Sequence, residues 1–429
     1  MTFREIFALR EFRALFLSGL ISAIGDYLSR AAITALIFDQ SRSVLLSAAA
    51  FAISYVPWLF GPLLSALAER YPYRSVMIAS DVGRMVLIGL LLLPGLPVPV
   101  MFLLVFAAGM AAPPARAARS ALLPMLVGRN HLGLAVATTQ TSGQAAQVIG
   151  YLIGATVSLA LTPRIALGLD VLTFAVSAVL VAYVIRHRPT QVPDGGREHL
   201  LAETSAGFRL VFGDRVLRSI AIVVFTMTVF AVVPEGLAAA WAGESASGPA
   251  ARGLDQGMIM AAGPLGFVIG GIAFNRLVPA SRRVRLVPVL AVLAPLLLVP
   301  TVAGVPAEAV ALMVLLSGLV QGAIMPTLNA TFVLALPDGF RARAFGVVNS
   351  GVQLSQFAAV MITGALAEQF RLPLVVGLWS IGGTAAMLIV AVFWPRPATF
   401  AEAAERAAAK EIPVPQARKP TTSVTPDAP

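Results

Sequence analysis

The first long apolar stretch of the chain, residues 12–38, reads FRALFLSGLISAIGDYLSRAAITALIF. About 20 consecutive apolar residues suffice for a helix to cross the hydrocarbon core of a bilayer. The stretch is too long for the apolar region of a signal peptide, and no small-residue cleavage site follows it. It therefore predicts a retained membrane-spanning helix. Asp26 and Arg30 interrupt this helix one turn apart.

The composition extends this prediction to the whole chain. Hydrophobic residues make up 58% of the 429 residues and charged residues only 12%, about half the charged fraction of a soluble domain. Cysteine is absent, which excludes disulfides. Counting apolar stretches predicts twelve spans, at residues 12–38, 44–68, 75–96, 98–118, 133–161, 165–185, 216–241, 256–278, 286–303, 307–334, 344–367 and 372–394.

The basic residues predict the orientation of these spans. Most of the 31 Lys and Arg lie at the two ends or in alternate loops, whereas the intervening loops hold Arg42, Arg164, Arg252 and Arg371. Because cytoplasmic loops carry the excess of Lys and Arg, we expect both ends and the central loop in the cytoplasm of a cell with the chain in its cytoplasmic membrane. Contact with anionic lipid explains this charge better than nucleic-acid binding, since no binding module is visible.

Two stripes of amide side chains indicate an internal repeat. The fifth span carries Gln140, Gln144 and Gln147, and the eleventh span carries a second set at the same spacing, Asn349, Gln353 and Gln356. Positions i, i+4 and i+7 share one helix face. We therefore predict an all-α membrane fold of two six-helix pseudo-repeats, residues 1–185 and 215–395. A cytoplasmic linker (186–214) joins them, and a cytoplasmic tail (396–429) follows, in which residues 401–411 can form a short polar helix and residues 413–429 are expected to be disordered.

Several segments resemble the major facilitator superfamily. SALAERYPYR at residues 65–74 is similar to its loop motif G-x-L-a-D-R-x-G-R-R, with Ser65, Glu69 and Tyr73 as departures. The stretches PARAARSALLP (114–124), DVLTF (170–174) and VPEGL (233–237) resemble the drug:proton antiporter branch of macrolide and enterobactin exporters, as found in actinobacterial members. The antiporter motif of helix 5 is reduced to Gly150-x3-Gly154 and lacks its Pro. The resemblance covers the chain up to residue 396.

The resemblance implies a cytoplasmic gate around Glu69. In that family the acid at this place holds the gate closed by meeting an arginine and the start of helix 11. The residues of this chain expected there are Glu69, Arg70, Arg74, Asp81, Arg84 and Arg119. The alternative is that they are ordinary loop charges.

Polar residues inside the spans are the other candidates. An isolated Asp or Arg in the membrane costs roughly 2.5–3.5 kcal/mol, and the spacing of Asp26 and Arg30 lets them pair. We expect either a proton or substrate site or a structural ion pair. Gln144 and Gln353 are expected to face a substrate cavity or to bond neighbouring helices. Asp170 and Glu235 fall near outer helix ends, where capping or gating is expected, and Glu235 is a secondary candidate for proton coupling.

Small residues predict close helix packing. Gly150 and Gly154 in the fifth span and Gly266 and Gly270 in the eighth have the spacing of small-residue helix interfaces. The resembling family places these two helices together between its halves.

The sequence favours a secondary transporter over a sensor or assembly protein of the same scaffold, because its intramembrane polar residues have no obvious structural need. We expect proton-coupled efflux of a small amphiphilic compound by a monomer, with an uptake permease as the alternative. No phosphate-binding Gly-rich loop with Lys and no nucleophile–base pair is visible, so we expect no enzyme and no cofactor. His131, His187 and His199 lie in loops, and no metal site is expected.

Overall fold

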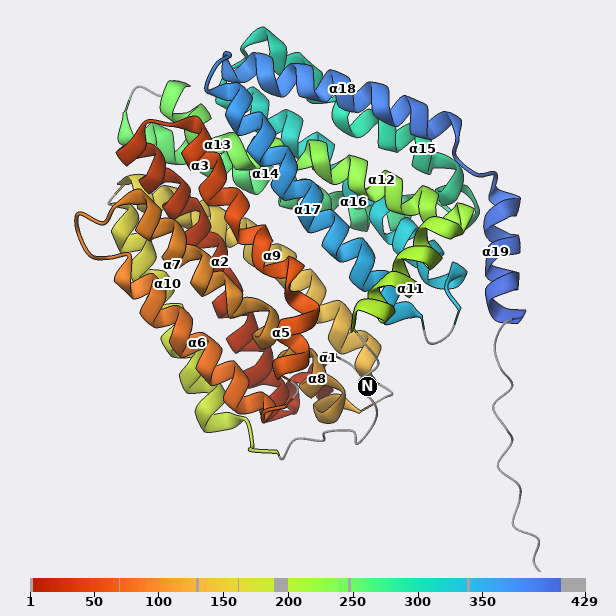
Figure 1. Cartoon of the computed structure of the whole chain (residues 1–429), viewed down its shortest axis with the longest axis horizontal. Helices are drawn as coiled ribbons and strands as arrows, with labels where there is room; N and C mark the ends of the chain where they lie inside the picture. Colours follow the sequence, from red (N-terminus) through yellow and green to blue (C-terminus); the bar gives the residue numbers. More distant parts are fainter. Residues whose placement is uncertain are drawn as a thin grey trace, which may run out of the picture.

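The computed structural model describes residues 3–68, 70–128, 131–160, 162–188, 200–245, 248–337 and 340–409. Within these ranges the chain is helical and no strand is found. Figure 1 shows the helices gathered in two bundles, coloured red to yellow and green to blue. We call them the N-half (residues 3–184) and the C-half (residues 200–409).

The N-half contains the first six predicted spans. Its helices are α1 (Phe3–Ala8), α2 (Arg10–Ser41), α3 (Val44–Ala52), the 3-10 turn η1 (Ile53–Tyr55), α4 (Val56–Leu59), α5 (Gly61–Ala68), α6 (Tyr73–Leu90), α7 (Val98–Met110), α8 (Ala112–Val127), α9 (Leu132–Ala160) and α10 (Pro163–Val184).

The C-half contains the other six spans and two flanking helices. Its elements are α11 (Leu200–Gly213), α12 (Arg215–Ala231), α13 (Val233–Ser245), α14 (Pro249–Leu277), α15 (Ala280–Leu296), η3 (Val299–Ala303), α16 (Ala307–Ala335), α17 (Arg341–Ala367), α18 (Leu372–Val392) and α19 (Pro397–Ala409). The flanking helices are α11 and α19. Val211 of α11 and Phe400 and Ala403 of α19 are buried in the core of this half.

Each predicted span coincides with one helix or with consecutive helices. Among the described residues, nine such segments are by themselves long and apolar enough to cross a membrane. The fourth span differs most from its prediction, because α8 continues to Val127 rather than ending near residue 118. Hydropathy ends the span near Arg116 and Arg119, but both arginines line the cavity between the halves, Arg116 as an exposed and Arg119 as a half-buried residue.

Two spans are broken beside the centre of the molecule. Pro57 stands near the start of α4, and the helix before it tightens to the 3-10 turn η1. A proline inside a helix removes one backbone donor and its ring clashes with the preceding turn. In the seventh span α12 ends at Ala231 and α13 begins at Val233, directly before Pro234. The two breaks present Tyr55 and Glu235 to the space between the halves.

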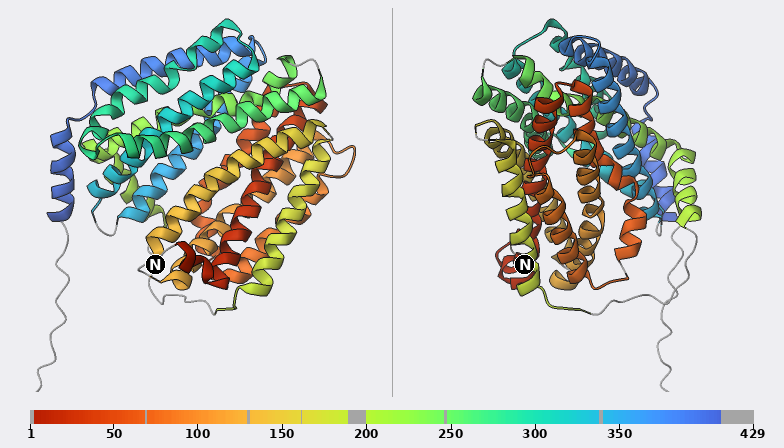
Figure 2. Two further views of the ribbon diagram at one scale, coloured as in Figure 1. Left: turned by 180° about the vertical axis from the view of Figure 1, so that it is seen from behind. Right: turned by 60° about the vertical axis from the view of Figure 1, so that its left-hand side comes forward.

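The two halves contact each other directly at the end of the bundle where α2 turns into α3, which we call the far end. Glu368, after α17, accepts hydrogen bonds from the Ser43 hydroxyl and from the Leu45 backbone N–H at 2.8 Å. Gln256 of α14 donates to the Ala31 carbonyl of α2 at 3.0 Å. Toward the opposite end, where α1 and α11 lie and which we call the termini end, the bundles diverge (Figures 1 and 2).

The glycine pairs expected at helix interfaces lie within each half. A Cβ on Gly154 would lie 2.6 Å from the Leu28 carbonyl oxygen of α2, and Gly150 also packs on α2. Gly266 and Gly270 pack on Leu315 and Leu319 of α16. Helices α9 and α14 do lie together between the halves. They meet through Gly257 and Ala155, so the glycine pairs serve packing inside a half.

Candidate functional site: a cavity between the halves

A cavity of about 860 Å³ lies between the two halves. Phe12 of α2 and Leu132 of α9, near the termini end, line it, and so do Asp26 and Glu235 deeper in. The contacts of Ser43 and Glu368 close the molecule at the far end. Pockets for small molecules measure about 300–1,000 Å³. The cavity therefore has the size of a small-molecule site.

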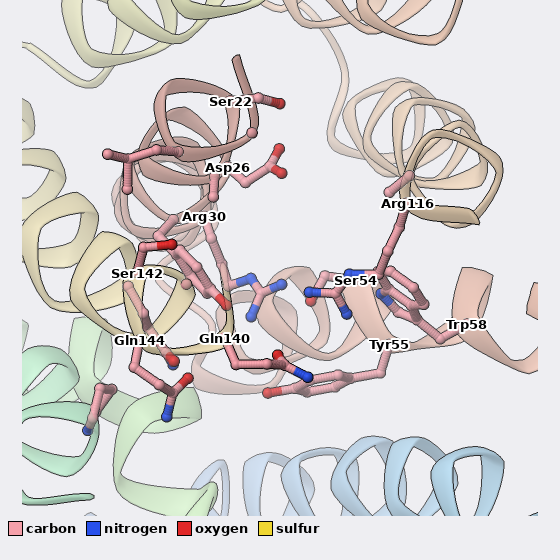
Figure 3. A pocket seen from close by; sticks show the side chains of 18 of the residues that line it. Ser22, Asp26, Arg30, Ser54, Tyr55, Trp58, Arg116, Gln140, Ser142 and Gln144 are labelled. Carbon is pink, nitrogen blue, oxygen red and sulfur yellow. The ribbon is translucent and has the colours of Figure 1, made fainter. Parts of the chain in front are cut away.

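Both amide stripes line this cavity, from α9 on one side and α17 on the other. They comprise Gln140, Gln144, Gln147, Asn349, Gln353 and Gln356. Figure 3 shows Gln140 and Gln144 at the cavity. Among the residues that the structure describes, these six side chains have no hydrogen-bond partner. The amides are thus available to a ligand, and the helix-to-helix bonding considered from sequence is not seen.

Asp26 pairs with a residue of another helix. It accepts a hydrogen bond from Arg84 of α6 and forms an ion pair with it. The expected pair with Arg30 on the same helix is therefore wrong. The Arg84 side chain is 10% exposed and that of Asp26 is 32% exposed. Because Asp26 lines the cavity, the pair opens to it through the carboxylate.

Arg30 lies among aromatic rings instead. Its guanidinium lies 5.4 Å from the ring centres of Tyr27 and Phe51 and 5.5 Å from that of Tyr55. It also donates to the Tyr151 hydroxyl at 3.4 Å. Aromatic faces attract cations electrostatically, and the attraction is stronger away from water. This environment holds the charge of Arg30 without a carboxylate.

Asp81 forms a second charge pair, behind the cavity wall. This buried carboxylate accepts a hydrogen bond from Ser177 of α10 at 2.6 Å and lies 3.8 Å from the Arg119 guanidinium of α8. Arg119 in turn donates to Ser177 at 3.3 Å. The three residues join α6, α8 and α10 inside the N-half.

Asp170 is a buried acid whose environment the sequence did not predict. It accepts hydrogen bonds from the hydroxyls of Ser29 on α2 and of Thr173, the latter at 3.0 Å. Gly25 makes room for it, because a Cβ there would collide with the Asp170 carboxylate. A signal was present: Ser22, Asp26 and Ser29 repeat the i, i+4, i+7 spacing of the amide stripes. Asp170 therefore bonds side chains inside the bundle, and the N-cap of α10 is Thr162 rather than Asp170.

The gate residues implied by resemblance are only partly described. Glu69 lies outside the described residues. Arg70 is exposed, and Arg74 donates to the Ala182 carbonyl at the end of α10 at 2.6 Å. Asp81, Arg84 and Arg119 belong to the ion pairs of the N-half described above. A gate role for these six residues stays a prediction.

Glu235 is the charge that the C-half adds to the cavity. Among the described residues it is the only charged side chain of that half in the lining. Its carboxylate packs beside Gly263 of α14, where a Cβ would lie 3.1 Å from the nearer oxygen. The cavity is therefore electrically uneven, with nearly all its charge on the N-half.

Comparison with known proteins identifies the family. Residues 15–299, more than half of the chain, match the family model of the Major Facilitator Superfamily. The chain belongs to this superfamily. A sequence search of curated proteins finds no match.

Solved structures of the same superfamily fold resemble the whole chain. A POT family transporter in complex with 5-aminolevulinic acid is 12% identical with a TM-score of 0.70, covering 90% of this chain and 96% of that one. The peptide transporter POT in complex with sulfate is 13% identical with a TM-score of 0.67, covering 95% of this chain and 99% of that one. A mutant of the nucleoside transporter NupG is 13% identical with a TM-score of 0.66, covering 91% of this chain and 99% of that one. At such identities the likeness concerns the fold.

Membership in the major facilitator superfamily settles the general class. The chain is a multi-pass membrane protein and a secondary transporter of a small molecule, not an enzyme. The all-α, twelve-span fold expected from sequence is confirmed. The cavity between the halves is the place where a superfamily transporter of this architecture holds its substrate, since sites in such folds lie where the repeats meet.

Proposed function

We propose that this transporter exports a small amphiphilic compound in exchange for protons, by alternating access. One observation carries the proposal: the cavity lined by both amide stripes contains a carboxylate, Asp26, whose charge is held by a single arginine. A transporter that couples substrate movement to proton movement needs a group that binds and releases a proton during the cycle. Intramembrane ionisable residues mark such sites.

The proposed orientation follows from the basic loops. With both ends in the cytoplasm of a cell and the protein in its cytoplasmic membrane, the termini end is cytoplasmic. The structure, closed at the far end by Ser43 and Glu368, then corresponds to the inward-facing state. We propose that the monomer is the working unit, because the cavity is formed by the two halves of one chain.

Asp26 and Arg84 suit the coupling step. Protonation of Asp26 removes its ion pair with Arg84. The Arg84 guanidinium, which also interacts with the nearby Asp170, is then free to pair with another residue. Loss of one partner from a buried pair costs several kcal/mol. Proton binding at Asp26 therefore changes the relative stability of arrangements of α2, α6 and α10, which is what coupling requires.

Inside-out membrane vesicles test the proposal. An imposed proton gradient is followed with a pH-sensitive dye while ethidium, rhodamine 6G or naphthalene-1-sulfonate is added. We expect at least one such amphiphile to release protons from vesicles that contain the transporter and not from empty ones. Accumulation of the compounds in right-side-out vesicles would instead support the uptake permease. No response in either orientation would support a non-transporting protein.

Asp26→Asn tests the coupling residue. We expect this variant to insert normally and to lose substrate-induced proton release. Asp39→Asn is the matched control, because Asp39 is an exposed acid at the far end of the same helix, outside the cavity. Unchanged proton release in Asp26→Asn vesicles would remove Asp26 from the mechanism.

A further inference from the structure

Four arginines line the cavity, and all belong to the N-half: Arg30, Arg84, Arg116 and Arg119. Asp26 neutralises Arg84, and Asp81 lies beside Arg119. Among the residues that the structure describes, no carboxylate lies within 4.0 Å of Arg30 or Arg116. Within the described ranges the cavity thus contains two guanidinium groups that form no ion pair.

Aromatic rings fix both groups. Arg116 lies over the ring of Trp58 at 4.9 Å, and Arg30 is surrounded by Tyr27, Phe51 and Tyr55. A guanidinium held against a ring keeps the N–H donors at its edges for other partners. Figure 3 shows Arg30 and Arg116 pointing into the cavity from different helices, with Tyr55 and Trp58 beside them.

We propose that Arg30 and Arg116 bind the anionic group of the transported compound, so that the substrate is an organic anion with a flat apolar body. This assignment rests on the proposed transport function and names the substrate class of the same cavity. A carboxylate, sulfonate or phosphate matches the planar donor edge of arginine. Gln140, Gln144 and Ser54 line the same cavity and add hydrogen-bond donors. The rings of Tyr55 and Trp58 receive the apolar body.

The remaining charges of the cavity disfavour a cationic substrate. Of its carboxylates, Asp26 is engaged by Arg84, and Asp170 accepts from Ser29 and Thr173. Glu235, on the C-half, is the remaining carboxylate that could bind a cation, and it interacts electrostatically with the positive charge of Arg30. A cation would therefore meet two uncompensated arginines for one free carboxylate, whereas an anion meets two available arginines.

Binding to the purified full-length transporter tests the proposal independently of transport. The protein is reconstituted in phosphatidylcholine nanodiscs, and calorimetry compares naphthalene-1-sulfonate, 1-naphthylmethanol and 1-naphthylmethylammonium, which share one ring system and differ in charge. We expect the sulfonate to bind at least about tenfold more tightly than the other two, since charge-assisted hydrogen bonds are the strong ones. Equal binding of the three, or preference for the ammonium compound, would overturn the proposal.

Variants locate the site. Arg30→Gln and Arg116→Gln are each expected to weaken sulfonate binding about 10- to 100-fold while changing 1-naphthylmethanol binding less than about twofold. Arg30→Lys keeps the charge in case Arg30→Gln does not fold, and it should lose less affinity because the planar donor edge alone is removed. Arg164→Gln is the control, since this exposed arginine lies outside the cavity. Full sulfonate affinity in Arg116→Gln would contradict the assignment.

Two further arms separate the alternatives. Adding phosphatidylglycerol to the nanodiscs should leave sulfonate affinity unchanged, and a loss of affinity would assign the arginines to a lipid headgroup and overturn the small-molecule assignment. Proton release in vesicles by ethidium but not by the sulfonate would support transport while overturning the anion site. Sulfonate binding without proton release would support the site and contradict proton-coupled export.

Discussion

Charged residues of α2 find their partners on other helices. Asp26 pairs with Arg84 of α6, and Arg30 one turn later lies among Tyr27, Phe51 and Tyr55. Spacing along one helix shows only that two side chains can meet. In a bundle, a neighbouring helix can offer a better-placed partner, because its side chain points across the helix interface toward the charged group. The sequence therefore identified both residues but not their contacts.

Removing Arg84 should destabilise the protein more than removing the whole pair. Arg84→Gln leaves the Asp26 carboxylate without its counterion, and we expect a loss of about 1.5–3 kcal/mol, seen as a lower midpoint of thermal unfolding in detergent. The double variant Asp26→Asn with Arg84→Gln should recover part of that loss, because no unpaired charge remains. A double variant less stable than Arg84→Gln would show that the ion pair is not the relevant interaction.

The buried polar residues were only partly predictable. Asp81 and Arg84 were named from sequence as candidate gate residues, whereas the role of Ser177 could not be predicted, because a lone serine inside an apolar helix has no distinctive pattern. The spacing of Ser22, Asp26 and Ser29 marks one helix face but does not show which residue Ser29 meets. Their importance comes from helices that meet in space, Ser177 at Asp81 and Ser29 at Asp170. Arg116 stood at the end of the predicted fourth span with no assigned role, and it lines the cavity from α8, which continues to Val127.

At the scale of helices, close packing depends on a few glycines. Gly154 lets α9 approach α2 so closely that any Cβ would lie 2.7 Å from the Leu28 Cα. Helices in membranes associate through such backbone approaches, since lipid provides no hydrophobic force between them. The spacing of the glycines predicted that they pack, and only the structure shows that the partner helices are α2 and α16.

Gly154→Leu should push α9 away from α2. Overpacking of a tight contact costs about 1–3 kcal/mol, and we expect lower yield of folded protein in fluorescence-detected size-exclusion chromatography. Gly168→Ala is the control, because nothing lies within 4 Å of its Cβ position in α10. Alanine is the better helix former there, so this variant should be as stable as the parent or slightly more so. Equal behaviour of the two variants would contradict the packing role.

At the scale of the whole molecule, a small contact closes the far end. Glu368 of the C-half accepts from Leu45 at the first turn of α3, and Ser43 is the N-cap of that helix. A carboxylate at a helix N-terminus is stabilised by the unpaired N–H groups there. This contact must break if the far end is to open during alternating access.

A cross-link at this contact should stop transport. The chain has no cysteine, so Ser43→Cys with Glu368→Cys introduces the only thiol pair. We expect oxidation, or a short bifunctional thiol reagent, to abolish substrate-induced proton release and reduction to restore it. Each single-cysteine variant treated in the same way is the control. Undiminished transport after confirmed cross-linking would show that the far end does not open.

The overall architecture was the most predictable feature. Span length and composition alone predicted twelve membrane segments, and each coincides with one helix or with consecutive helices, because a bilayer leaves a chain few alternatives to long apolar helices. The amide stripes predicted that the fifth and eleventh spans correspond, and both stripes line one cavity. The uneven charge of that cavity was not predictable, since it depends on which faces of α2, α6 and α8 turn inward.

The uneven charge between the halves has an electrical consequence. Moving one elementary charge through a membrane voltage of 100 mV changes the free energy by about 2.3 kcal/mol. In the described part of the chain no carboxylate lies within 4.0 Å of Arg30 or Arg116, and both belong to the N-half, whereas the C-half contributes Glu235 to the cavity. Tilting the N-half therefore displaces net positive charge along the field. Under the proposed alternating access in the cytoplasmic membrane, the membrane voltage would act on the balance between the two end states mainly through the first six spans.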